Sequence, residues 1–330
     1  MFNTERAKLL LAQNGILFAL LGIIVFFSIA NPRFFSLQNA QTVLLQVADL
    51  GLIAIPLALI VMSGSVDLSV GSIASVSGVT AAMVMVATGN WPLGILAGLA
   101  VGAVAGALNG VLTAYLNLNP LVVTLGFLSV WGGLALYLTN GSTVAKLPEG
   151  FRALGSQTVL GVPIQVIILI VIVALGWYLL NKRPFGRQLL AIGGNERASY
   201  LMGVKVRSIR VRLFVLAGVL SALAGVMLAA KLQAATPITG VSMEVQALTV
   251  VLLGGVAFEG GSGRISGVVI GLLFVGVLRN GLVILGVSQF VQTILVGLML
   301  VIAVALDRSM QKVVQRSWSR LVKKQQLAQA

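Results

Sequence analysis

Repeated runs of about 20 apolar residues are the feature that most constrains how this chain can fold. They recur along most of its 330 residues, of which 58% are hydrophobic and only 9% are charged. A backbone inside lipid must satisfy its own hydrogen bonds, so such runs are expected to be helices. The alternating ten-residue pattern of an outer-membrane barrel is absent. The sequence therefore predicts an all-α polytopic membrane protein.

We expect about ten transmembrane helices. Their predicted ranges are 12–30, 43–63, 69–88, 92–115, 120–140, 163–181, 210–230, 245–258, 265–286 and 289–306. Of the 22 lysine and arginine residues, 17 fall in segments predicted to be cytoplasmic and four in predicted external loops, with Arg279 inside a span. Because cytoplasmic loops carry the excess of basic residues, this bias predicts that both termini lie in the cytoplasm.

Composition argues against several functions. The net charge of +14 does not indicate nucleic-acid binding, because the basic residues gather at the ends of apolar runs. The chain has no Cys and no His, so we expect no thiolate or histidine metal site and no catalytic residue. It also lacks the GxxxxGK[ST] phosphate loop, so we expect no ATP or other cofactor on this chain. Energy for transport must then come from a partner or from an ion gradient.

The longest polar break between apolar runs, residues 181–212, holds eight of the 22 basic residues. We interpret its core, 182–209, as a cytoplasmic loop. Asn195 is a good N-cap for a short helix inside it, and Glu196 suits the positively polarised first turn. Gly203 is typical of the residue that ends a helix.

One face of this short helix is apolar, because Ala198, Leu201 and Met202 are adjacent at helical spacing. An apolar face outside the membrane indicates docking to a partner. The alternative is a solvated connector that packs on its own membrane domain.

The run 245–258 is the weakest span. About 14 apolar residues are too few to cross a bilayer upright, so this segment is either a half-helix or a broken helix, as in many transport pathways, or a tilted helix extended by residues 242–246. Glycines at 98, 102, 106 and 110 form a stripe that favours close helix packing rather than a pore lining. Faint echoes between 64–73 and 255–265, and between 109–126 and 280–297, are consistent with an internal repeat.

The stretch SGSVDLSVGS at 63–72 joins two predicted spans. Asp67 can cap a helix that begins at Leu68, or it can belong to a transport path, because ionisable groups at membrane depth are usually functional. Asp49 and Arg279 are also intramembrane charges, which could pair, face a cavity or sit near the ends of spans.

Six blocks in order resemble the membrane subunit of ribose-type sugar importers, which are ATP-binding-cassette permeases. The first two are SGSVDLSVGS and NPLVVTLG (119–126), followed by YLTNGS (137–142), FGRQLLAIGGNERASYLMGV (185–204) and a final pair, VVLLGGVAFEGGSGRISGVVIG (250–271) with RNGLVILGVS (279–288). The resemblance covers nearly the whole chain. The early stretches NPRFF (31–35), IAIPLALIVMSG (53–64) and NPLVVTLG (119–126) look closest to the rhamnose and signal-molecule branch of this family.

The resemblance implies a single permease domain over 1–330, with a coupling loop at 182–209 and a basic cytoplasmic tail at 307–330, in the bacterial inner membrane. It implies a second permease copy or sister permease, a periplasmic binding protein, two cytosolic ATPase subunits that hold ATP and Mg²⁺, and a small neutral sugar. The residues implied to couple to the ATPase are Gly193, Gly194, Asn195, Glu196, Ala198, Leu201, Met202 and Gly203. The structural or path candidates are Asp67, Ser69, Gly71, Asn109, Thr124 and Asn280.

Other function classes stay open at this point. A branched-chain amino acid permease of the same superfamily would need charges or helix ends for a zwitterion. An ion-coupled carrier would use Asp49 or Asp67 as its proton or sodium site. A membrane enzyme is the weakest alternative, because His, Cys and paired acids are missing.

Overall fold

The computed structural model describes residues 2–305, with side chains from Gly15 onward. The helices of the first half are α1 (Phe2–Ala30), α2 (Leu37–Met62), α3 (Val70–Thr88), α4 (Trp91–Ala114), α5 (Pro120–Thr139) and α6 (Glu149–Ser156). Those of the second half are α7 (Ile164–Lys182), α8 (Pro184–Gly194), α9 (Glu196–Leu201), α10 (Val206–Leu232), α11 (Met243–Leu253) and α12 (Ile265–Ile284), followed by an apolar helix over Gln289–Ala305.

Seven of these helices are long and apolar enough to cross a membrane, namely α2, α3, α4, α5, α7, α10 and α12. Three shorter apolar helices, Gly15–Ala30, Met243–Leu253 and Gln289–Ala305, fall at the other three expected positions. The expected polytopic helical class is confirmed, while the count of ten crossings and the orientation of the termini stay predictions.

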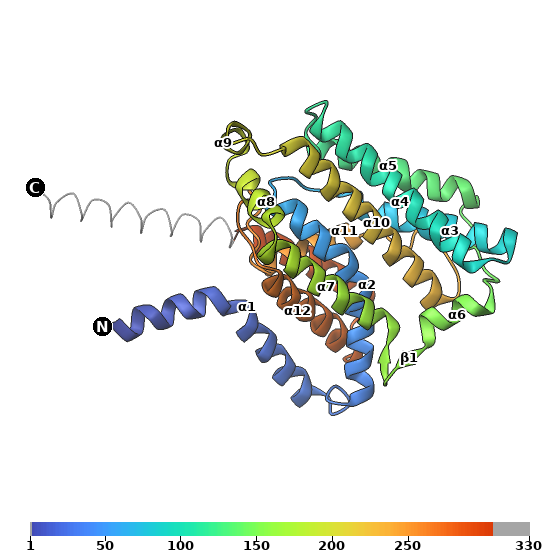
Figure 1. Cartoon of the computed structure of the whole chain (residues 1–330). Helices are drawn as coiled ribbons and strands as arrows, with labels where there is room; N and C mark the ends of the chain where they lie inside the picture. The colour runs from blue at the N-terminus through green and yellow to red at the C-terminus, as the bar shows by residue number, and fades with distance from the viewer. Residues whose placement is uncertain (1, 306–330) are drawn as a thin grey trace, which may run out of the picture.

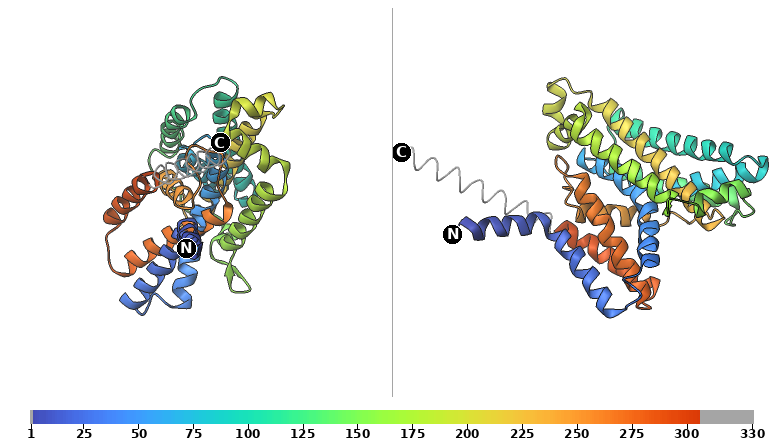
Figure 2. Two further views of the ribbon diagram at one scale, coloured as in Figure 1. Left: turned by 90° about the vertical axis from the view of Figure 1, so that its left-hand side faces the viewer. Right: turned by 60° about the horizontal axis from the view of Figure 1, so that its bottom comes forward.

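Helix α2 forms the centre of the fold. It packs against α7, α10, α11 and α12, and every residue from Val47 to Met62 is buried. A helix that is apolar on all sides is stable only when it is surrounded, and in this stretch only Asp49 is polar. Figures 1 and 2 show α3, α4 and α5 on one side of α10, with α1 and α12 on the opposite side of the molecule.

The predicted glycine stripe on α4 is confirmed as a packing surface. A methyl group added at Gly102 would lie 2.3 Å from the carbonyl oxygen of Gly218 on α10, and one at Gly106 would lie 2.2 Å from that of Phe214. Two backbones approach this closely only where neither side chain intervenes. The stripe therefore holds α4 against α10.

Different elements lie at the two ends of the molecule. In Figure 1, the start of α1 lies to the left together with α8 and α9, while α6 and the hairpin lie toward the right. Both chain ends must lie on the side of α8 and α9 if the predicted orientation holds. The basic tail 307–330 lies outside the described residues, as do the side chains of Arg6 and Lys8.

The segment between α5 and α7 carries structure that the all-helical expectation missed. Strands β1 (Thr158–Val159) and β2 (Val162–Pro163) form an antiparallel hairpin, with positive φ at Leu160 and Gly161 in its turn. Two central residues with positive φ are typical of the tight hairpin turn that matches strand twist.

Helix α11 resolves the alternatives for the weakest span. It has 11 residues, which corresponds to about 16 Å of helix and is too short to cross a bilayer at any tilt. It also ends at Leu253, five residues before the predicted end of the span. The structure therefore favours a half-helix over a tilted span extended at its start.

We predict that Gly102→Ala destabilises the protein, because the new methyl group must push α4 away from α10; overpacking of this kind costs about 1–3 kcal/mol. The matched control is Gly126→Ala on α5, where an added methyl group has no neighbour within 4 Å. Thermal unfolding in detergent should show a lower Tm for Gly102→Ala and an unchanged or higher Tm for Gly126→Ala. Equal Tm values for the two variants would contradict the packing role.

Candidate functional site

The short helix α9 presents apolar side chains to the surface outside the membrane helices. The exposed fractions are 70% for Tyr200, 76% for Leu201 and 84% for Met202, and Ala198 is also exposed. Large apolar residues exposed side by side mark an interaction site. The three residues of the predicted apolar face are therefore exposed, and Tyr200, which was not part of that prediction, is exposed beside them.

The start and end of α9 follow the predicted signals. The Asn195 side-chain oxygen accepts a hydrogen bond from the Ala198 backbone N–H at 2.9 Å, which is N-cap geometry. The chain leaves the helix through Gly203 at φ +82°. Because both ends are fixed by short-range contacts, α9 keeps its shape although it is only six residues long.

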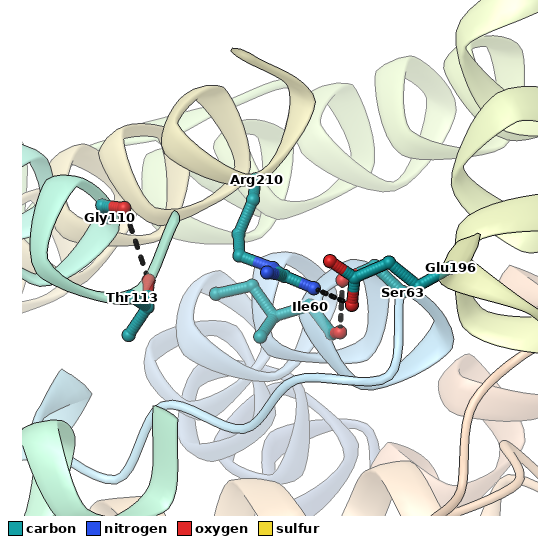
Figure 3. Close-up of polar contacts among 6 residues, drawn as sticks. All are labelled: Ile60, Ser63, Gly110, Thr113, Glu196 and Arg210. Atoms are coloured by element: carbon teal, nitrogen blue, oxygen red, sulfur yellow. Dashed lines mark hydrogen bonds and ion pairs between the residues drawn. The ribbon is translucent and has the colours of Figure 1, made fainter. Parts of the chain in front are cut away.

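An ion pair fastens α9 to α10. Arg210 of α10 donates to Glu196 of α9 at 2.6 Å, and the arginine side chain is only 11% exposed. Figure 3 shows Arg210 reaching toward Glu196 beside Ile60 and Ser63, at the end of α2. The pair therefore holds α9 beside the first turns of α10.

Three distant segments meet at what we call the glycine junction: 62–64 at the end of α2, 193–194 at the end of α8, and 260–261 before α12. The Gly261 N–H donates to the carbonyl oxygen of Met62 at 2.9 Å. A methyl group at Gly193 would lie 2.0 Å from the same oxygen. Gly64, Gly260 and Gly261 all have positive φ. The helix that leads into α9 thus touches the backbones of both α2 and the α11–α12 connection.

Asp67 lies in a buried polar cluster between the start of α3 and α4. Helix α3 begins at Val70, not at Leu68 as predicted, and Ser69 is its N-cap residue. The Asp67 carboxylate accepts from the Ser69 N–H at 2.9 Å and from its hydroxyl at 2.6 Å, and Asn109 donates to the same hydroxyl oxygen at 2.7 Å. All three side chains are completely buried. The cluster ties the start of α3 to α4, which supports a structural role.

The other three candidates are separate from that cluster. Gly71 allows α3 to touch the segment before α11, because a methyl group there would lie 2.3 Å from the Gly240 carbonyl oxygen. The Thr124 hydroxyl donates to its own helix at 3.5 Å, and Asn280 is buried on α12. None of the six candidates lines the cavity described next, so the structure does not bring them together as one site.

A partly open cavity of about 330 Å³ lies among α2, α10, α11, α12 and the start of the helix 289–305. Its lining is mixed, and we call it the polar cavity because of the eight polar side chains in it. Lys231 bonds to Asp49 at 2.9 Å, and Arg279 contacts the side-chain oxygen of Gln246. The two intramembrane charges therefore do not pair with each other. The polar side chains that line the cavity are Gln46, Asp49, Lys231, Thr239, Gln246, Arg279, Gln289 and Gln292.

Lys231 directly follows the predicted span 210–230, in one of the loops predicted to be external, so its contact with Asp49 was not predicted. The two residues are 182 positions apart, and no local pattern indicates such a contact. One signal in the sequence could have indicated the contact, because a buried carboxylate in lipid needs a cation and Lys231 lies in the last turn of the apolar helix α10.

Comparisons with known proteins agree with this architecture. The profile of the family described as "Branched-chain amino acid transport system / permease component" matches residues 39–304. The ribose import permease protein of Bacillus subtilis is 40% identical over 288 residues, covering 87% of this chain and 89% of that protein. The Escherichia coli K12 ribose import permease protein is 35% identical, covering 92% and 96% of the two chains.

An arabinose relative extends the comparison. The L-arabinose ABC transporter permease protein of Azospirillum brasilense is 37% identical over 299 residues, covering 91% of this chain and 88% of that protein. No solved structure is significantly similar to the chain. A profile match over most of the length, relatives at 35–40% identity and seven membrane-length helices lead to one conclusion. The chain belongs to this family of transport-system permease components and is a multi-pass protein of the bacterial inner membrane.

Proposed function

We propose that this chain is the permease subunit of an ATP-binding-cassette importer that moves a monosaccharide or related small polyol into the cytoplasm. The observation that carries the proposal is full-length similarity to permeases named for ribose and arabinose in three different bacteria. A substrate close to a pentose is therefore favoured. Assignment to the rhamnose and signal-molecule branch stays a prediction.

The coupling contact is α9. Tyr200 and Leu201 of α9 and the adjoining Met202 are exposed. The segments on either side of them in the chain carry seven exposed basic residues: Lys182, Arg183, Arg187, Arg197, Lys205, Arg207 and Arg212. An apolar centre with a charged rim is typical of a protein interface. We expect a cytosolic ATPase subunit with an apolar pocket and an acidic rim to bind here.

The complete transporter contains more than this chain. ATP and Mg²⁺ are bound by the ATPase subunits, since this sequence has no phosphate-binding loop. A second copy of this chain or a sister permease completes the pathway, and a periplasmic binding protein delivers the solute. In this arrangement residues 1–330 form one permease domain, both termini are cytoplasmic, and the loop 182–209 and the tail 307–330 face the ATPase side.

The alternatives are less well supported. The family description names branched-chain amino acids, but the curated relatives reported above are named for sugars. An ion-coupled carrier would need a carboxylate available to a proton or sodium ion. The Asp49 carboxylate already has a cation, Lys231, as its partner. Asp67 is bonded to Ser69 through one oxygen only, but it does not line the cavity.

We predict that Met202→Asp abolishes association with the ATPase while leaving the permease folded, because a carboxylate replaces an apolar contact that must be desolvated. Ala198→Asp should weaken association through the same face. The matched control is Leu160→Asp, which introduces the same charge at a residue that is 99% exposed in the β1–β2 turn. Co-purification with the tagged ATPase measures the effect. Retention of the ATPase by Met202→Asp would remove the evidence for docking through α9.

We predict ATP-dependent uptake of a pentose by proteoliposomes that contain the complete complex, with the binding protein supplied outside. Uptake should persist when ionophores collapse proton and sodium gradients, because ATP supplies the energy. Uptake of leucine without any sugar would favour the amino acid alternative. Loss of uptake on addition of the ionophore, with ATP still present, would favour the ion-coupled carrier.

A further inference from the structure

We infer that the polar cavity around Asp49, Lys231, Gln246 and Arg279 is a solute-binding site within the permease, and that it holds a neutral polyhydroxylated molecule the size of one monosaccharide. The inference rests on the proposed function and names the place in this chain where the sugar is held. At about 330 Å³, the cavity lies at the small end of the roughly 300–1,000 Å³ range of small-molecule sites.

The lining offers both donors and acceptors. Four glutamines at positions 46, 246, 289 and 292 supply amide N–H donors and carbonyl acceptors, and Arg279 and Lys231 supply further donors. Each sugar hydroxyl both donates and accepts, so a mixed lining can satisfy several hydroxyls at once. A lining of one charge sign would be expected instead for an ionic solute.

The cavity lining holds one ion pair. Asp49 is bound by Lys231, whereas Arg279 is held by the neutral amide oxygen of Gln246. Asp49 is the one carboxylate among the lining residues, so the ammonium group of an amino acid would have to compete with Lys231 for it. This arrangement favours a solute without an ammonium group over an amino acid.

The energetic cost of placing polar and charged side chains in this cavity supports a functional role for them. Polar and charged side chains inside a membrane protein are unfavourable and are normally retained for function. One oxygen of Asp49 is buried without a hydrogen-bond partner among the described residues. Apolar side chains such as Val47, Leu50, Leu228 and Val275 line the same cavity, so the lining combines apolar surface with a small number of polar groups, as is typical of small-molecule sites.

The same helices connect the cavity to the glycine junction. Asp49 and Met62 are 13 residues apart on α2, which corresponds to about 20 Å. Gln246 and Arg279 lie on α11 and α12, whose connection carries Gly260 and Gly261. Movement at the junction therefore reaches three walls of the cavity, which is the connection that a solute site in a coupled transporter needs.

The experiment uses the absence of cysteine from the chain, so that one introduced cysteine is the only thiol in the permease. Gln246→Cys places it in the cavity, and Gln46→Cys serves as a second variant if the first does not fold. Leu160→Cys is the control, because residue 160 is fully exposed in the β1–β2 turn. Each permease is assembled with a cysteine-free ATPase and binding protein, reconstituted, and treated with a hydrophilic methanethiosulfonate reagent.

We expect labelling of the cavity cysteine to reduce sugar uptake at least tenfold, while the ATPase stays bound and still hydrolyses ATP; labelling Leu160→Cys should leave uptake unchanged. Full labelling of Gln246→Cys and Gln46→Cys, verified by mass spectrometry, with uptake equal to the labelled control would overturn the inference. A wild-type complex that takes up no sugar would instead refute the proposed function, so the two failures are distinguishable.

Discussion

Contact between backbones at glycine residues is the constraint on which the rest of this structure depends. Lipid tails are as apolar as leucine, so helices in a membrane associate through close packing and hydrogen bonds rather than through the hydrophobic effect. Gly102 and Gly218 bring α4 onto α10, and Gly193 brings α8 onto the end of α2. Added methyl groups at these positions would overlap carbonyl oxygens, so side-chain adjustment cannot relieve the clash.

These contacts make one continuous path from the surface to the interior. The exposed helix α9 is fixed to α10 by the Glu196–Arg210 pair and follows α8, whose last residues lie in the glycine junction. Helices α2 and α12 run from that junction to the polar cavity. Small shifts are transmitted through packed helices because their interfaces do not deform continuously. An ATPase that moved α9 would thereby change the shape of the cavity.

Local patterns in the sequence predicted the features that depend on local physics. Apolar runs located the helices, Asn195 and Gly203 predicted the limits of α9, and the four-residue glycine spacing predicted the surface that packs on α10. Long-range contacts were not predictable in this way. The Asp49–Lys231 pair, the contact of Gly193 with Met62 and the cavity arise from tertiary packing between distant segments. Polar candidates that were chosen individually, such as Thr124 and Asn280, consequently do not lie together in one site. The start of α3 was predicted two residues too early, because Asp67 bonds to Ser69 and Ser69 is the N-cap residue.

Site-directed cross-linking tests the central claim, that α9 is the contact through which the ATPase drives this permease. Met202→Cys would be the only cysteine of the permease, and a short bifunctional reagent would join it to single cysteines placed around the predicted pocket of the ATPase. The account predicts a cross-link from position 202 whose yield changes between ATP-bound and nucleotide-free complexes, and none from Leu160→Cys at the other end of the molecule. An ATPase that binds the permease but never cross-links to position 202 would contradict it.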